Sequence, residues 1–194
     1  MKICFLDNSS IPYTSNDLNS KLIRGGENAI IHLSNELSQL GNEVEVYNNN
    51  KNNCIINEVK WFNLNCANKN LTYDVAFTNN DIRLFKNVVA RKYVAFSHSI
   101  QSIEKFIRKG QLLSYFKYKP KIVLLGNYHN KNRNYLLKLF GTINLKWAVD
   151  PLFLKTELNE NLIENRAIFT SRKDRNLDIL IKLWKKEIFT KNKS

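Results

Sequence analysis

The sequence has few cysteines, prolines and glycines, and it has no long apolar run. Its three cysteines, Cys4, Cys54 and Cys66, lie far apart, and no Cys-x-x-Cys pair occurs. This spacing predicts neither a zinc site nor a disulfide framework, so we expect free thiols and a reducing, cytoplasmic environment. No segment approaches the roughly 18 consecutive apolar residues that would span a bilayer. The first apolar run, residues 3–6, is too short for a signal-peptide core and indicates a buried strand.

Several enzyme motifs are also absent. No Gly-x-Gly-x-x-Gly follows the first strand, which argues against a dehydrogenase, and the lack of Gly-x-x-x-x-Gly-Lys-Ser/Thr excludes a P-loop. Neither Gly-x-Ser-x-Gly nor His-Glu-x-x-His occurs, so hydrolytic functions have no support. We expect no metal ion and no resident cofactor.

Acidic side chains are scarce. The chain has 17 Asp and Glu against 30 Lys and Arg, which gives a net charge of +13. Compositional drift accounts for this most simply, because Asn and Lys dominate stretches such as residues 48–53. The alternatives are attraction to an anionic membrane surface or to a phosphate-bearing ligand and, after these, to nucleic acid. No nucleic-acid-binding module is recognisable in the sequence.

Short apolar segments and amphipathic helices alternate along the chain. The strands do not alternate apolar and polar residues, which is typical of a parallel sheet covered on both faces, so we predict a doubly wound Rossmann-like α/β fold. The Asn-rich stretch that ends at Asn53 is predicted to be a surface loop, and the pattern restarts after residues 150–151. Strands are predicted at residues 3–6, 43–47, 58–64, 74–78, 93–96, 121–125, 143–149 and 167–170, and helices from 29 to 40, 81 to 87, 102 to 118, 132 to 140 and from 177 onward.

Polar side chains follow nearly every predicted strand. Ligands of open parallel sheets bind beyond the carboxyl ends of the strands, so these residues line the expected site, and their hydroxyl-binding groups suit a sugar or another polyol. The residues are Asp7, Asn8, Asn79, Asn80, Ser97, His98, Asn127 and His129, together with residues 147–150 and 171–175.

Two glycines precede the first long helix. In the segment Arg24-Gly25-Gly26-Glu27, they allow the backbone to approach a ligand, and the helix amino terminus offers N–H groups to an anion. A flexible turn that feeds a helix, with Glu27 favourable at the helix start, would give the same sequence.

The order of these segments carries a resemblance. Gly25-Gly26-Glu27 is followed by a helix that ends in residues 37–46, with the sequence LSQLGNEVEV, and residues 93–98 form a strand that ends at His98. The chain continues with WAVDPLF at residues 147–153 and FTSRKDRNLDIL at residues 169–180. In this order the segments resemble the retaining glycosyltransferases of family 4, which have the two-lobed GT-B fold. The family opens with a strand, a Gly-Gly-x-Glu loop and a helix closing on Leu-x-x-x-Gly-His-Glu-Val.

The resemblance implies an enzyme that transfers a sugar from a nucleotide-sugar to a glycan or lipid-linked acceptor, without a metal ion. Residues 1–152 would form the Rossmann-like acceptor-side domain, and residues 153–194 the linker and the first strand and helix of an incomplete donor-binding lobe. His98 would contact the transferred sugar near the reacting carbon. The remaining assignments are Gly25, Gly26, Arg175 and Arg172 for the phosphate and sugar of the donor, and Asn8, Asn79, Asn127 and His129 for the acceptor.

The sequence also departs from the family pattern. Asn42 replaces the usual His, Asn176 stands where Gly is usual, and Lys173 stands where Pro is common. The later Glu-containing motif for the nucleotide ribose does not occur in these residues. A second hypothesis therefore stays open, namely a non-catalytic protein. It would be either a truncated remnant or a glycan-binding subunit whose apolar second-lobe helix is covered by a partner chain. A nucleic-acid-binding protein is the third hypothesis. The expected location is the cytoplasm, with peripheral contact at the inner face of the membrane.

Overall fold

A computed structural model describes residues 1–18, 23–98, 102–145 and 176–189. The chain divides into two compact units, residues 1–148 and residues 149–194, and each is described by itself. The predicted linker at residues 147–153, the predicted strand at 167–170 and both Arg172 and Arg175 lie outside the described residues.

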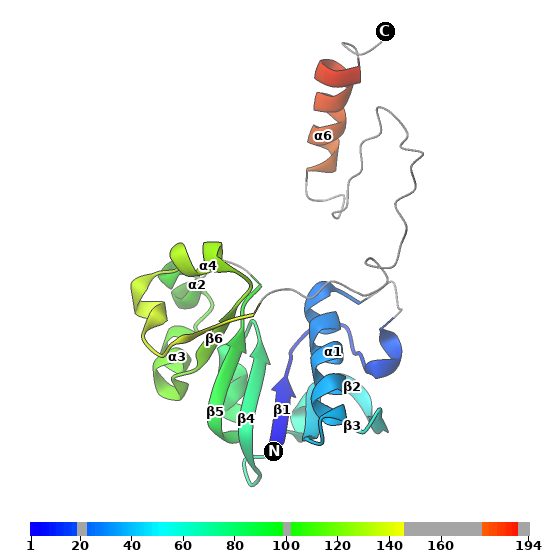
Figure 1. Cartoon of the computed structure of the whole chain (residues 1–194), viewed down its shortest axis with the longest axis vertical. Coiled ribbons are helices and arrows are strands. Elements are labelled where there is room, and N and C mark those ends of the chain that lie inside the picture. The colour runs from blue at the N-terminus through cyan, green and yellow to red at the C-terminus, as the bar shows by residue number, and fades with distance from the viewer. Residues whose placement is uncertain (19–22, 99–101, 146–175, 190–194) are drawn as a thin grey trace. The chain divides into compact units, whose positions relative to one another are not determined.

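The first unit is built on a seven-stranded sheet with the order β3-β2-β1-β4-β5-β6-β7, and neighbouring strands run parallel (Figure 1). Helices flank this sheet, so the predicted doubly wound, Rossmann-like α/β class is confirmed. The strands are β1 (Lys2–Leu6), β2 (Glu43–Ile56), β3 (Val59–Asn63), β4 (Thr72–Asn79), β5 (Val89–Phe96), β6 (Lys121–Leu124) and β7 (Thr142–Asn144).

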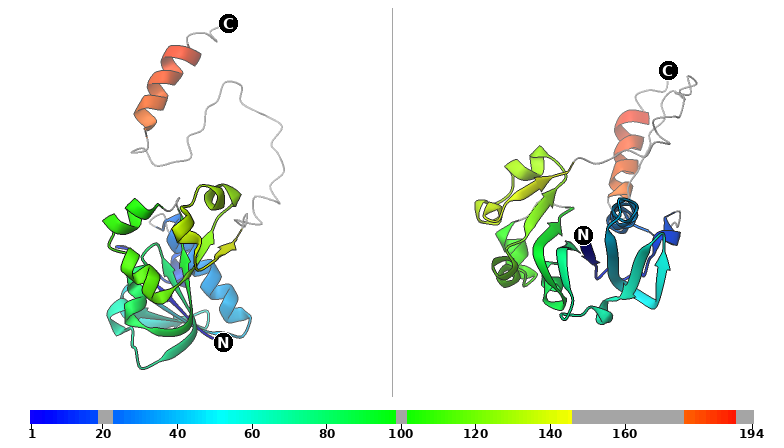
Figure 2. Two further views of the ribbon diagram at one scale, coloured as in Figure 1. Left: turned by 90° about the vertical axis from the view of Figure 1, so that its left-hand side faces the viewer. Right: turned by 60° about the horizontal axis from the view of Figure 1, so that its bottom comes forward.

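Two hydrophobic clusters cover the two faces of the sheet. Side chains alternate between faces along a strand, so Ile3 and Phe5 of β1 belong to one cluster and Cys4 and Leu6 to the other. Helix α1 (Gly25–Gln39) covers the first face beside β2, and Figure 2 shows the same arrangement from two other sides. The other cluster includes residues of η3 (Ile82–Asn87), α2 (Ile103–Arg108) and α3 (Leu112–Tyr118).

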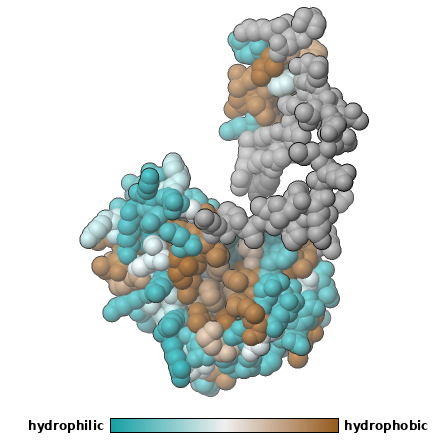
Figure 3. Space-filling view, viewed as in Figure 1, coloured by the Kyte–Doolittle hydropathy of each residue, from teal (hydrophilic) through white to brown (hydrophobic). Residues whose placement is uncertain are grey.

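The covering of the first face is incomplete. Figure 3 shows apolar residues gathered at the surface beside α1, and the partly buried Val75 and Phe77 of β4 belong to this face. Phe77 stacks on Phe5, with ring centroids 4.8 Å apart.

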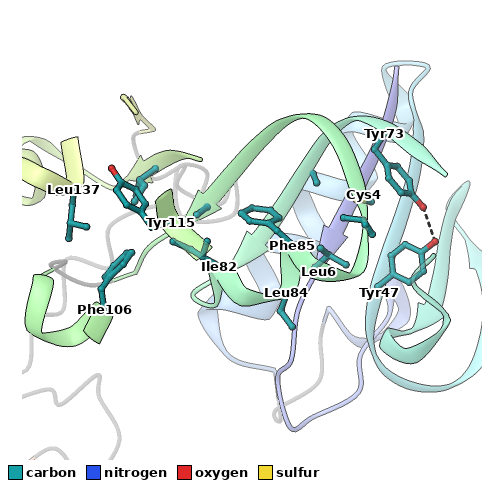
Figure 4. Close-up of a cluster of buried hydrophobic side chains, with 14 of the residues drawn as sticks. Cys4, Leu6, Tyr47, Tyr73, Ile82, Leu84, Phe85, Phe106, Tyr115 and Leu137 are labelled. Carbon is teal, nitrogen blue, oxygen red and sulfur yellow. Dashed lines mark hydrogen bonds between the residues drawn. The ribbon is translucent and has the colours of Figure 1, made fainter. Parts of the chain in front are cut away.

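A buried polar network lies in the other cluster, towards the amino-terminal end of the sheet. The Tyr47 and Tyr73 hydroxyls donate to Glu45 Oε2 at 2.8 and 2.5 Å and lie 2.8 Å from each other (Figure 4). Glu45 is 4% exposed, and Lys2 Nζ lies 3.3 Å from its Oε1. Burial raises the pKa of both phenols, so they remain protonated donors.

Three predictions of secondary structure were wrong in part. The Asn-rich stretch belongs to β2. After β2 the chain reverses at a two-residue turn, Asn57 and Glu58, which have φ of 52° and 61°. The first half of β2 pairs parallel with β3, whereas residues 54–56 at its end run antiparallel to β3, with Ile56 opposite Val59. The helix predicted over residues 102–118 is interrupted at Gly110, with φ of 62°. The helix predicted over residues 132–140 is replaced by α4 (Asn127–Lys131) and the 3-10 helix η4 (Tyr135–Lys138).

In the second unit, the described residues form one helix. It comprises α6 (Leu177–Leu183) and the π-helical η5 (Trp184–Phe189), which confirms the helix predicted from residue 177 onward. Most of its apolar side chains are exposed, including Ile179 and Phe189, while Leu177 and Trp184 are partly buried. None of the helices in the described parts of the chain has the length and apolar content to cross a bilayer.

Candidate functional site

The carboxyl ends of β1 and β4 mark the point where the strand order reverses. From β1 the chain proceeds to β2 and β3 on one side, and then crosses to β4 on the other. The crevice outside such a reversal is where open α/β sheets bind ligands. Asp7 follows β1, Asn79 ends β4, and His98 follows β5 by two residues.

Asp7 anchors the site in the protein interior. It is 1% exposed, and its carboxylate accepts hydrogen bonds from the Tyr13 hydroxyl at 2.8 Å and the Ser9 N–H at 3.2 Å. A longer contact of 3.4 Å joins Asn79 Nδ2 to Asp7 Oδ1. Burial raises the pKa of Asp7, while its hydrogen bonds with Tyr13 and Ser9 oppose that shift.

The Asn79 amide connects Asp7 with His98. Because its Nδ2 faces the carboxylate, its Oδ1 faces His98 Nε2, 3.1 Å away, and also accepts from Asn80 Nδ2 at 3.0 Å. An amide oxygen can only accept, so the imidazole donates from Nε2. Burial lowers the pKa of His98, although the negative charge of Glu27 raises it by a smaller amount. Because burial outweighs the effect of Glu27, the His98 ring is favoured in its neutral form, with its proton on Nε2.

Gly26 lies against this pair. A Cβ on Gly26 would lie 3.1 Å from Asn79 Nδ2 and 3.5 Å from His98 Nε2, whereas a Cβ on Gly25 would meet no atom within 4 Å. The structure therefore brings the first turn of α1 and the imidazole together in one place. Only the second glycine of the pair makes this close approach.

The first turn of α1 also carries a buried acid. Glu27 is 5% exposed and accepts a 2.5 Å hydrogen bond from Ser9 Oγ. A carboxylate at a helix amino terminus is stabilised by the helix dipole. The sequence indicated only this favourable position, and not the contact with the loop that follows β1.

A cleft of about 480 Å³ opens beside the group formed by Asp7, Asn79 and His98. Asn80 connects the two, because its Oδ1 accepts from the His98 backbone N–H at 3.3 Å and its side chain lines the cleft. Asn8 also lines the cleft, and its Nδ2 donates to Asp81 Oδ2 at 3.0 Å. Two of the four residues predicted to bind the acceptor, Asn8 and Asn79, thus lie close to His98 or to the cleft next to it.

Within the described residues, Asn127 and His129 make no hydrogen bond or ring contact with Asp7, Asn79 or His98. They belong to α4, which follows β6. Asn127 is exposed, and the His129 ring contacts only that of Tyr128 among the described aromatic side chains.

Sequence reasoning missed Tyr13 and the residues lining the cleft that come from other elements. Tyr13 lies in an irregular loop, where no periodicity indicates its direction. Arg108 and Lys109 end α2, and the only signal that marks them is the glycine that follows. The described part of the chain contains no group of His, Cys, Asp and Glu side chains that could hold a metal ion.

Comparisons of the chain with models of protein families, with curated proteins and with solved structures found no match.

Proposed function

We propose that residues 1–148 form the acceptor-side lobe of a nucleotide-sugar-dependent glycosyltransferase, which transfers a sugar to a glycan or lipid-linked acceptor. The cytoplasm, with access to the inner face of the membrane, is the proposed location. In this proposal Arg172 and Arg175 neutralise the diphosphate leaving group.

One observation carries the proposal: Gly26 and His98, which are 72 positions apart in the sequence, lie together at the switch point of the sheet. A glycine at the start of α1 lets a ligand approach the backbone, and the amino terminus of this long helix attracts negative charge. Both features suit the diphosphate and sugar of an activated donor.

The His98 imidazole supplies a hydrogen-bonding group for the sugar. Its Nε2–H faces Asn79, and Nδ1 of the neutral ring has the chemistry of a hydrogen-bond acceptor. A neutral, partly buried acceptor can bind a sugar hydroxyl without attracting a counter-ion. His98 thereby orients the transferred sugar, and Asn79 with Asp7 holds the ring in its tautomer.

The direct test measures nucleoside diphosphate release from a panel of UDP- and GDP-sugars, with glycan and polyprenyl-linked acceptors. His98→Ala is compared with His32→Ala, since His32 is exposed on α1. Loss of a hydrogen bond inside a site costs about 1–3 kcal/mol, so we expect His98→Ala to lower kcat/KM by roughly 5- to 150-fold. His32→Ala should retain the rate of the unmodified chain.

Two results would contradict the proposal. The first is the absence of turnover with every donor, together with calorimetry that detects no binding of UDP or GDP. The second is an equal loss of activity in both histidine variants. Glycan binding without nucleotide binding would instead identify the non-catalytic, glycan-binding alternative.

A further inference from the structure

The cleft next to His98 carries an excess of positive charge. Its lining includes three cationic side chains, Arg83, Arg108 and Lys109, and one carboxylate, Asp81. Its volume of about 480 Å³ falls within the range of small-molecule sites.

The single carboxylate already has its partners. Arg83 Nε and Nη2 donate to the two oxygens of Asp81 at 2.9 and 2.8 Å, and Asn8 donates to the same group. These contacts lower the pKa of Asp81 against the opposing effect of burial, which is the largest single influence. The Asp81–Arg83 pair is therefore neutral as a unit, and among the described residues that line the cleft no other carboxylate balances the charges of Arg108 and Lys109.

No carboxylate in the described part of the chain forms an ion pair with Arg108 or Lys109. The neighbouring Lys105 responds to both charges. Burial is the main reason that the pKa of Lys105 is lowered, and repulsion by Lys109 and Arg108 lowers this pKa further. Like charges held this close indicate a local positive potential that an anion would relieve.

The backbone holds these cations in place. The Lys109, Gly110 and Gln111 N–H groups bond to carbonyls of α2 at 3.0, 2.9 and 2.8 Å, and Gly110 provides the left-handed turn that ends the helix. Gln111 is 4% exposed, and its Nε2 donates to the Asn80 carbonyl at 3.0 Å. Because Asn80 also contacts the His98 backbone, the cationic loop is connected to the proposed sugar site by hydrogen bonds.

We propose that this cleft binds a phosphate or diphosphate group of the acceptor, through Arg108 and Lys109 with Gln111 and Asn80 beside them. The assignment to the acceptor rests on the proposed function, because it places the anion next to the imidazole that orients the sugar. The binding of the anion does not depend on transfer and is measured separately. The ligand is a phosphate ester that is either soluble, as in a sugar phosphate, or attached to a lipid.

The test titrates inorganic pyrophosphate into the full ¹⁵N-labelled chain. We expect the amide signals of Lys109 and Gly110 to shift and to saturate. Arg108→Gln with Lys109→Gln should weaken binding by about tenfold or more, because charge-assisted hydrogen bonds are lost. The matched control is Lys69→Gln with Lys121→Gln, which removes two positive charges from exposed lysines, one in the turn before β4 and one at the amino end of β6. The control should bind pyrophosphate as the unmodified chain does.

Equal binding by both double variants, or shifts confined to residues outside the cleft, would overturn the proposal. Thermal unfolding of each variant ensures that a loss of binding is not a loss of folding. Failure of sugar transfer with retained, Arg108- and Lys109-dependent pyrophosphate binding would contradict the proposed function and leave the anion site intact.

Further titrations separate the sources of the phosphate. Glucose 1-phosphate and farnesyl diphosphate represent the soluble and the lipid-linked ligand, and tighter binding of either in an Arg108- and Lys109-dependent manner supports the site and identifies its source. UDP is the third ligand. If UDP binding is lost in the Arg108 and Lys109 double variant, the cleft belongs to the donor and the assignment to the acceptor is wrong.

Discussion

At the scale of single residues, the two glycines before α1 have different surroundings. Gly26→Ala places a methyl group 3.1 Å from Asn79 Nδ2, while Gly25→Ala places it in open space. Alanine favours a helix by up to about 1 kcal/mol over glycine, so Gly25→Ala should keep or slightly raise the stability. We expect Gly26→Ala to displace the Asn79 amide and, with it, the His98 ring.

Histidine NMR measures this displacement directly, because the Nε2–H of His98 reports on its bond to Asn79. The Gly26→Ala variant should change the His98 ring signals and lower nucleotide-sugar turnover by about tenfold, which corresponds to about 1.4 kcal/mol. Gly25→Ala serves as the control. The same ring signals in both variants would show that the contact with Gly26 does not hold the imidazole.

The pKa of His98 gives a prediction about stability. Burial lowers this pKa below the ordinary value of about 6.5, so the unfolded chain binds a proton more readily than the folded one. The stabilising contribution is complete above about pH 6.5 and is lost as the pH falls through the folded pKa. We expect His98→Gln to reduce the loss of stability on acidification over this range.

Urea unfolding at a series of pH values measures the effect, with His32→Gln as the comparison. The His98→Gln curve should be flatter than that of the unmodified chain from about pH 6.5 downward. Parallel curves for the unmodified chain and His98→Gln would contradict a lowered pKa at His98.

At the scale of elements, β1, β2 and β4 are joined by the buried Glu45 network as well as by their ladders. Tyr73→Phe removes a donor to a carboxylate that is 4% exposed. Such a bond contributes about 1.5–3 kcal/mol, so the free energy of unfolding should fall by that amount. Tyr118→Phe is the control, since within the described residues its hydroxyl forms no hydrogen bond and its ring packs on Phe85.

Chemical denaturation measures the free energy of unfolding of both variants. Tyr118→Phe should change stability by less than about 0.5 kcal/mol. An equally small change in Tyr73→Phe would mean that Tyr47 alone satisfies the Glu45 carboxylate.

Much of the element order could be predicted because it depends on local patterns. The apolar face of α1 and Gly41 at its end, with φ of 79°, mark that helix clearly. The extension of β2 could not be predicted, because asparagines favour turns and this strand is held by its pairing with β3. Gly110 interrupts a continuous helical periodicity, and only its positive φ shows that it ends α2.

The candidate site was also predictable in part. The rule for parallel sheets indicated Asp7, Asn79 and His98, because the ends of strands can be recognised in the sequence. Tyr13 and the pair Arg108 and Lys109 could not be assigned in this way, because loop conformation and the end of a short helix determine where these side chains lie. The roles of Arg172 and Arg175 stay predictions.

At the scale of the whole molecule, the first unit contains what a folded domain needs. The members of both hydrophobic clusters lie between Ile3 and Phe140, and β7 ends at Asn144. About 150 residues are enough to bury a substantial core. We therefore expect a chain of residues 1–148 to fold by itself and to bind pyrophosphate as the full chain does.

Urea unfolding and pyrophosphate titration of residues 1–148, beside residues 1–194, test this expectation. The transition should remain cooperative, and the free energy of unfolding should agree with that of the full chain to within about 1 kcal/mol, near the error of the extrapolation. The double substitution Arg108→Gln with Lys109→Gln should weaken pyrophosphate binding by the same factor in residues 1–148 as in the full chain. A broad transition, or a fall of several kcal/mol, would mean that residues 149–194 are needed to complete the core of the first unit, whose apolar face at Val75 and Phe77 is only partly buried.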